Sequence, residues 1–207
     1  MDLPSVFHLH YHVPDVEYAA SVLSSHGIEP NRRFGSVDGE SVSLSADETP
    51  PESFTLRLQT NRGGVADVTL TPGPRLEFDH VGVVVEDVSA AVDRATERAW
   101  SVTENERRTF LITPWGFRLE LQRATSDVVS ALGSPEDCRF TEAILGVPTE
   151  LRDDISRTIR AVVGDVQNLR VAPVRGSTSA VREAILDGDN VETPRFEMAS
   201  LTAEETV

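Results

Sequence analysis

The sequence predicts an α+β fold in which two β-α-β-β-β modules pair to form a curved, mixed-sheet cup. Two observations predict it. A strand–helix–strands order occurs twice, at about residues 5–72 and 76–124, and the first strand of each copy carries a histidine at the same place. Residues 1–124 are therefore expected to hold both modules.

The first module begins with FHLHYHV, residues 7–13, where apolar and histidine side chains alternate as in a half-buried strand. His8, His10 and His12 then share one face. Asp15 is expected to cap a helix that Gly27 ends. Short alternating runs follow, RRFGSV, ESVSLSA and SFTLRLQT, with turn residues between them.

The second module repeats this order. LEFDHVGVVV is typical of a strand, Asp87 of a helix cap, and VSAAVDRATERAW of an amphipathic helix. A short strand near Trp100, the run RRTFLIT, a Pro-Trp-Gly turn and the strand FRLELQ complete it.

Two pairs of matching segments set the alignment of the copies. Matching Asp15 with Asp87 places His8 opposite His80, and matching the two Leu-Gln pairs places Arg57 opposite Glu120. Loops of different length absorb the difference between the two offsets.

The remaining chain is expected to form a helix and linker at 125–138, an α+β region at 139–202 and a solvated tail at 203–207. The α+β region shows a third β-α-β-β-β order without histidine. Either it is a degenerate third module, or it is an unrelated subdomain that covers the pair or makes a homodimer contact.

The net charge of the chain argues against binding to nucleic acid or membranes. The 207 residues include 19 basic side chains, all arginine, against 34 acidic ones, for a net charge of -15. Such a surface repels phosphate backbones and anionic lipid, so neither nucleic acid nor membrane is an expected partner. Acid excess without lysine is the pattern of proteins from halophiles, in which salt screens self-repulsion.

The single Cys138 excludes an intramolecular disulfide. The N-terminal residues have no basic and apolar regions typical of a secretion signal, and no stretch is long enough to span a bilayer. A cytoplasmic location is therefore expected.

His8, His80 and Glu120 are the predicted metal ligands. If the modules curl around each other, their first and last strands line one cup, and two imidazoles and a carboxylate meet there. This set suits a divalent first-row metal with positions open for substrate. The alternatives are ordinary: a lone histidine on a strand is often structural, and Glu120 could lie on a solvated strand face.

His10 and His12 share the face of His8, which makes each a candidate catalytic acid or base, a partner that orients a ligand, or a ligand itself. Arg57 is a candidate substrate-binding residue, because a guanidinium can hold a substrate oxyanion in bidentate fashion. A surface salt bridge is the alternative for Arg57.

HLHYHVPDVE and DHVGVVVEDVSAAV resemble the two first-strand motifs of the vicinal oxygen chelate superfamily, which includes glyoxalase, bleomycin-resistance and extradiol-dioxygenase proteins. RTFLITPWGFRLELQ resembles the closing hairpin of that family. The resemblance covers about residues 5–123 and implies a metal held by His8, His80 and Glu120. Fe2+ or Mn2+ is preferred, and Zn2+ or Ni2+ is an alternative.

The resemblance implies a metal-dependent enzyme for a small, oxygen-chelating substrate, with an extradiol-type dioxygenase preferred. Arg57 replaces the fourth ligand of glyoxalase-type members, which speaks against lactoylglutathione lyase activity. The alternatives are a glyoxalase-type lyase or isomerase, a metal-free small-molecule-binding protein like the bleomycin-resistance members, and a structural protein whose C-terminal region fills the cup.

Overall fold

The computed structural model describes residues 4–203, and most of them form β-structure. The strands are β1 (Ser5–Val13), β2 (Glu29–Val37), β3 (Glu40–Ser45), β4 (Phe54–Gly63), β5 (Ala66–Pro72), β6 (Glu77–Val85), β7 (Ser101–Glu104), β8 (Thr109–Ile112), β9 (Arg118–Arg123), β10 (Arg139–Pro148), β11 (Leu169–Val174), β12 (Ala180–Asp187) and β13 (Arg195–Glu197). The helices are α1 (Val16–Ser24), α2 (Val88–Thr96), α3 (Asp127–Ser130) and α4 (Arg152–Val163), with 3-10 turns η1 (Thr149–Leu151) and η2 (Met198–Leu201).

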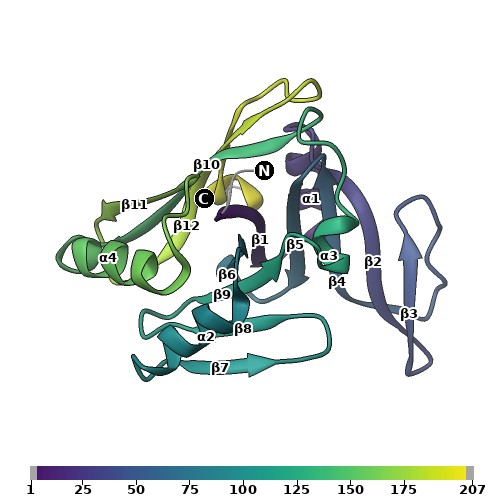
Figure 1. Cartoon of the computed structure of the whole chain (residues 1–207). Helices are drawn as coiled ribbons and strands as arrows, with labels where there is room; N and C mark the ends of the chain where they lie inside the picture. The colour runs from purple at the N-terminus through teal and green to yellow at the C-terminus, as the bar shows by residue number, and fades with distance from the viewer. Residues whose placement is uncertain (1–3, 204–207) are drawn as a thin grey trace.

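The first nine strands form one curved mixed sheet in the order β3-β2-β4-β5-β1-β6-β9-β8-β7. Figure 1 shows β1 and β6 at its centre, with the outer strands of the two modules on opposite sides. β1 and β6 are antiparallel, and each pairs in parallel with the last strand of its own module, β5 or β9. The predicted α+β cup of paired modules is confirmed.

Aspartate caps start the helix of each module at the predicted positions. Asp15 accepts a hydrogen bond from the backbone N–H of Tyr18 at 2.9 Å, and Asp87 accepts one from Ala90 at 3.0 Å. Each carboxylate thereby satisfies a backbone donor that the first helical turn leaves free. This repeated cap holds the helix at the end of each first strand.

The first module has four strands after its helix, where the sequence predicted three. β2 and β3 form a hairpin that turns at Asp38 and Gly39, both with positive φ, and β3 is an additional edge strand. β5 is the strand that the sequence prediction lacks, since the runs RRFGSV, ESVSLSA and SFTLRLQT correspond to β2, β3 and β4. β5, and not β4, is therefore the counterpart of β9.

The C-terminal region forms a second sheet in the order β11-β10-β12-β13, with α4 packed against it. The predicted β-α-β-β-β order is present, but the pairing differs from that of the two modules. β10 pairs in parallel with β11, the strand directly after the helix, and antiparallel with β12. This region is therefore not a third module of the same topology.

The register of β10 against β12 nevertheless repeats that of β1 against β6, including both interruptions of the pairing. In this overlay Glu142 corresponds to His8 and Glu183 to His80. Each of these glutamates forms an ion pair with an arginine. The second sheet thus resembles a reduced copy of the central strand pair in which the histidine positions are acidic.

One apolar core joins the two sheets and the helices. Leu9, Tyr11 and Val13 of β1 are fully buried in it, and the Tyr11 hydroxyl donates to the Val181 carbonyl of β12 at 3.1 Å. The histidines of β1 occupy the opposite face, as the alternation predicted. Among residues 4–203 no helix has the length and apolar character needed to cross a membrane, and residues 204–207 of the predicted tail lie outside the described part.

Candidate metal centre

His8 and His80 lie on the two central antiparallel strands, where β1 and β6 cross the floor of the cup. The register places Gly82 directly opposite His8 and places His80 opposite His10. A Cβ atom at Gly82 would lie 2.6 Å from the His8 Cβ, closer than two carbon atoms can approach. The missing side chain at position 82 is what lets the His8 ring lie toward His80.

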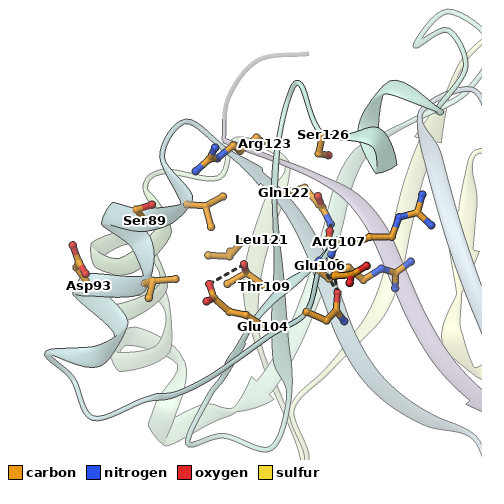
Figure 2. A pocket seen from close by; sticks show the side chains of 14 residues that line it. Ser89, Asp93, Glu104, Glu106, Arg107, Thr109, Leu121, Gln122, Arg123 and Ser126 are labelled. Carbon is orange, nitrogen blue, oxygen red and sulfur yellow. Dashed lines mark hydrogen bonds between the residues drawn. The ribbon is translucent and has the colours of Figure 1, made fainter.

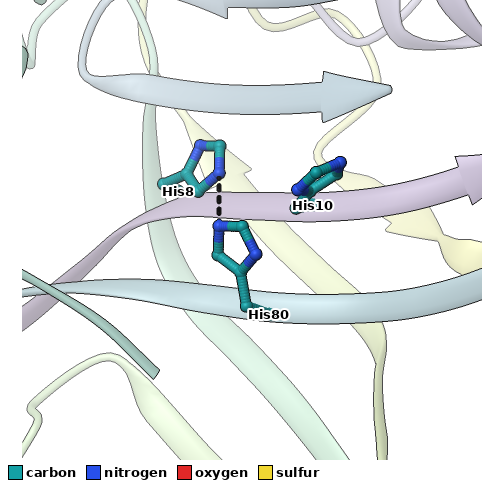
Figure 3. A group of neighbouring side chains, drawn as sticks. All are labelled: His8, His10 and His80. Carbon is teal, nitrogen blue, oxygen red and sulfur yellow. Dashed lines mark hydrogen bonds between the residues drawn. The ribbon is translucent and has the colours of Figure 1, made fainter. Parts of the chain in front are cut away.

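The ring nitrogens of these two histidines face each other. His8 Nε2 lies 3.2 Å from His80 Nε2, as Figure 3 shows, and His80 Nε2 lies 3.2 Å from Glu120 Oε2. Each of the three residues is 1 % exposed. The fold therefore brings together residues from β1, β6 and β9 that are far apart in the chain.

The other ring nitrogen of each histidine is held by an aspartate. His8 Nδ1 lies 2.6 Å from Asp67 Oδ2, and His80 Nδ1 lies 2.9 Å from Asp79 Oδ2. A carboxylate only accepts hydrogen bonds, so both Nδ1 atoms are the donors. The two Nε2 atoms are then available as acceptors or ligands, and carboxylate–histidine pairs of this kind orient metal-binding imidazoles in proteins.

The carboxylates around the centre are held ionised. Burial raises the pKa of Glu120, but its contact with His80 and the charge of Arg108 outweigh burial and lower this pKa to about 2. The pKa of Asp67 is also lowered, because its hydrogen bonds and ion pairs outweigh burial. The same balance lowers the pKa of Asp79 well below its usual range.

Each of these carboxylates also forms an ion pair with an arginine. Asp67 pairs with Arg62, Asp79 with Arg118, and Glu120 with Arg108. Three acidic and three basic groups therefore balance, and a divalent cation would give this set a net charge of about +2.

His10 and His12, the predicted catalytic residues, line the cup beside the centre. His10 Nε2 lies 2.8 Å from Thr71 Oγ1, its Nδ1 lies 3.2 Å from Asp79 Oδ2, and its ring stacks on that of His12. Burial lowers the pKa of His10 to about 4, so the imidazole is neutral at pH 7.

Among the described residues, the groups whose ligand atoms all lie within 4.8 Å of one another both contain His10, and neither contains Glu120. His8, His10 and His80 each offer a ligand atom within 4.8 Å of the others, and so do His10, His12 and Asp79. His10 is thus close enough to serve either as a neighbour of the ligands or as one of them.

Arg57 is exposed on β4, and its alignment with Glu120 was wrong because β5 had been overlooked. Register pairs Gly82 with Glu120 in the second module and His10 with Thr69 in the first, so Thr69 is the residue that matches Glu120. A role of Arg57 in substrate binding stays a prediction.

Thr69 is 2 % exposed, and its hydroxyl has no hydrogen-bond partner among the described residues. Such a buried polar atom is costly unless a ligand or water satisfies it. The Thr69 hydroxyl is therefore an unsatisfied polar group on the same face of the sheet as the proposed metal ligands.

Several residues of the centre were not anticipated. Asp67 and Thr69 belong to the overlooked strand, although the alternation of Asp67, Thr69 and Thr71 with apolar residues was a usable signal. Asp79 directly precedes His80, but only the fold turns its carboxylate toward the His80 ring.

Comparisons with known proteins rest on structure alone, because no family model and no curated protein matches the sequence. An Mn(II)-bound glyoxalase from Novosphingobium aromaticivorans is similar, with a TM-score of 0.60 and 12% identity over 86% of this chain. The match covers 63% of the glyoxalase, so this chain spans less than two thirds of its length.

Two other solved structures are similar. A variant of 4-hydroxymandelate synthase from Streptomyces coelicolor has a TM-score of 0.61 at 10% identity, and the match covers 90% of this chain and 71% of the synthase. Homoprotocatechuate 2,3-dioxygenase from Arthrobacter globiformis has a TM-score of 0.56 at 12% identity, with 86% and 62% covered. The paired modules, their strand order and these neighbours show that the chain has the fold of the vicinal oxygen chelate superfamily.

Proposed function

We propose that the chain is a divalent-metal-dependent enzyme that acts on a small, oxygen-chelating substrate, with His8, His80 and Glu120 as the metal ligands. The observation that carries the proposal is the meeting of His8 Nε2, His80 Nε2 and Glu120 Oε2 at 3.2 Å steps. With both Nδ1 protons directed to aspartates, these three acceptor atoms require a shared proton or a cation.

The two 3.2 Å contacts of His80 are close to the spacing of neighbouring ligands on one metal ion. Ligand atoms about 2.1 Å from an ion and at right angles to each other lie about 3 Å apart. His8, His80 and Glu120 are not a group whose ligand atoms all lie within 4.8 Å of one another, so the Glu120 carboxylate must turn toward His8 for the three to share an ion. The unsatisfied Thr69 hydroxyl also fits, since an oxygen of a ligand bound beside the centre would satisfy it. A bound divalent cation would act as a Lewis acid that stabilises negative charge on the chelated oxygens of the substrate.

Other side chains near the centre would orient the metal ligands and transfer protons. Asp67 and Asp79 would hold the ligand rings in place, and the half-buried His10, neutral at pH 7, is the proposed acceptor of a proton from the substrate. His12, stacked on His10, is the second candidate for that role.

An extradiol-type dioxygenase that uses Fe2+ or Mn2+ is the preferred activity. Two histidines and one carboxylate leave positions open for substrate and O2, and Thr69 rather than a carboxylate occupies the place that matches Glu120. The Mn(II)-bound glyoxalase and the homoprotocatechuate dioxygenase support a metal enzyme of this fold. A lyase or isomerase remains the nearest alternative reaction.

A metal-free binding protein is the second candidate, because Arg108 already neutralises Glu120. Metal analysis of protein purified at high salt without chelator separates the two. We expect about one divalent ion per chain, lost in His80→Ala and Glu120→Gln but kept in His26→Gln, which alters a buried histidine outside the cup. Absence of stoichiometric metal from the wild type would favour the binder.

Turnover is tested after anaerobic loading with Fe2+. Ring cleavage of a catechol, lost in the His80→Ala protein, is the expected result for the dioxygenase. A metal-loaded protein that leaves every catechol intact would point to lyase or isomerase chemistry. The cytoplasmic location and the homodimer stay predictions from the sequence.

A further inference from the structure

Three arginines form the outer layer of the proposed metal centre. The side chains of Arg62, Arg108 and Arg118 are 24%, 34% and 36% exposed, whereas His8, His80 and Glu120 are buried beneath them. Three partly exposed guanidinium groups therefore lie beside the carboxylates of the centre, in a chain whose net charge is -15.

Arg108 is the least restrained of the three. Arg62 also donates to the Ala131 carbonyl at 3.2 Å, and Arg118 lies over the Phe110 ring at 4.7 Å. Among residues 4–203, Arg108 has one ion-pair partner, Glu120, and the distance from its Nη1 to Glu120 Oε2 is 3.4 Å. That oxygen is also the one closest to His80 Nε2.

The backbone of Arg108 is nevertheless fixed. Asn105 Oδ1 accepts hydrogen bonds from the N–H groups of Arg107 and Arg108, and the Asn105 N–H donates to the Arg108 carbonyl. Gln122 Nε2 donates to the Arg107 carbonyl at 3.1 Å and to Glu120 Oε1 at 2.8 Å. These hydrogen bonds fix the backbone of residues 105–108 next to Glu120. The guanidinium of Arg108 can still move to a different anionic partner.

A pocket of about 480 Å³ lies at this loop (Figure 2). Arg108 and Gln122 line it and also contact Glu120. The remaining charged residues on its wall, two arginines and three acids, are Arg107, Arg123, Asp93, Glu104 and Glu106. These charges nearly cancel, so Arg108 is the group that can favour an anion next to the centre.

Metal binding would change the partner of Arg108. A divalent cation on Glu120 Oε2 takes over the charge compensation that Arg108 provides, and two cations on one oxygen repel each other. The guanidinium would then turn to another anion within reach, and a carboxylate matches its planar fork of donors.

From these contacts we propose that Arg108 is a specificity-determining residue that binds a carboxylate of the substrate. The substrate class is a small molecule with two adjacent chelating oxygens and a separate carboxylate. This inference rests on the proposed function, because it requires the metal at His8, His80 and Glu120.

The experiment compares 3,4-dihydroxybenzoate with 3,4-dihydroxybenzamide, which have nearly the same shape and differ in charge. Mn2+ stoichiometry is measured first, without oxygen, and calorimetry then gives the dissociation constant of each probe for the Mn2+-loaded protein. We expect the benzoate to bind about tenfold more tightly or better, the usual size of a charge-assisted hydrogen bond. Equal affinities in the wild type would overturn the proposal without any variant.

Two variants locate the effect. Arg108→Gln should bind Mn2+ and the benzamide but lose the preference for the benzoate. Arg107→Gln removes the same charge from the same loop and should keep the preference. If both variants lose it equally, general loop charge is responsible and the role of Arg108 is refuted. A wild type without stoichiometric Mn2+ would instead refute the proposed metal centre, so the two failures are distinguishable.

Discussion

The carboxylate of Asp67 holds the His8 ring from the side opposite His80, with Asp67 Oδ2 2.6 Å from His8 Nδ1. The two residues are 59 positions apart and meet through the parallel pairing of β1 and β5. Asp67 is itself fixed by Arg62, whose Nε lies 2.6 Å from Asp67 Oδ1. This chain of contacts aims His8 Nε2 into the cup.

Asp67→Asn should weaken metal binding without abolishing the fold. Loss of the carboxylate releases the orientation of the His8 ring, and changes of this kind cost about 10–100-fold in metal affinity. Titration with Mn2+ measures the effect. Asp165→Asn, at an exposed ion pair with Arg160, is the matched control and should bind like the wild type. Equal affinities in both variants would exclude the orienting role of Asp67.

Arg108→Gln should strengthen metal binding. In the wild type the Arg108 guanidinium and a metal compete for Glu120 Oε2, and removal of the competing charge favours the ion. We expect a several-fold lower dissociation constant for Mn2+ in the variant than in the wild type. An unchanged or weaker affinity would show that Arg108 does not compete for this oxygen.

The neutral state of the half-buried His10 predicts a pH-dependent stability. Its pKa is lowered to about 4 in the folded protein, against 6.5 ordinarily, so the unfolded chain binds the extra proton between these values. The stabilisation is complete above about pH 6.5 and is lost as the pH falls toward 4, by at most about 3 kcal/mol. Urea unfolding of metal-free protein measures it.

His10→Gln should flatten the decline in unfolding free energy between about pH 6.5 and 5. Within that range, carboxylates contribute little to the slope, because their pKa values lie below it, so the comparison isolates His10. Parallel curves for wild type and variant would contradict a neutral, half-buried His10.

Gly82→Ala should damage both stability and metal binding. The added Cβ would lie 2.6 Å from His8 Cβ and 2.9 Å from a ring carbon of Phe7, so β1 must shift. Overpacking of this kind costs about 1–3 kcal/mol, and the shift moves His8 away from His80. Thermal unfolding and Mn2+ titration check the two effects, and wild-type behaviour in both would contradict the predicted clash.

High salt should stabilise the protein. A net charge of -15 produces self-repulsion, which ions screen. The urea midpoint is expected to rise between about 0.1 M and about 2 M KCl. A midpoint that falls, or does not change, would refute the interpretation of the charge pattern as a salt adaptation.

Local sequence patterns were sufficient to predict the order of strands and helices in each module, because each pattern depends only on residues close together in the chain. The alternation of residues 7–13, the caps Asp15 and Asp87, and the spacing of His8 and His80 required no knowledge of distant contacts. The strand count of the first module was harder to predict: β5 has the same period as other strands, but the three runs before it already complete a β-α-β-β-β order.

The sequence by itself determined the paired α+β modules and the histidine and glutamate candidates within their first and last strands. Only the tertiary structure decided that Asp67 and Asp79 hold the rings, that Thr69 matches Glu120, and that arginines cover the centre. The physical reason is the range of the interactions. Periodicity and capping act over a few residues, whereas the pairing of β1 with β5 and β6 joins segments some 60 to 70 positions apart.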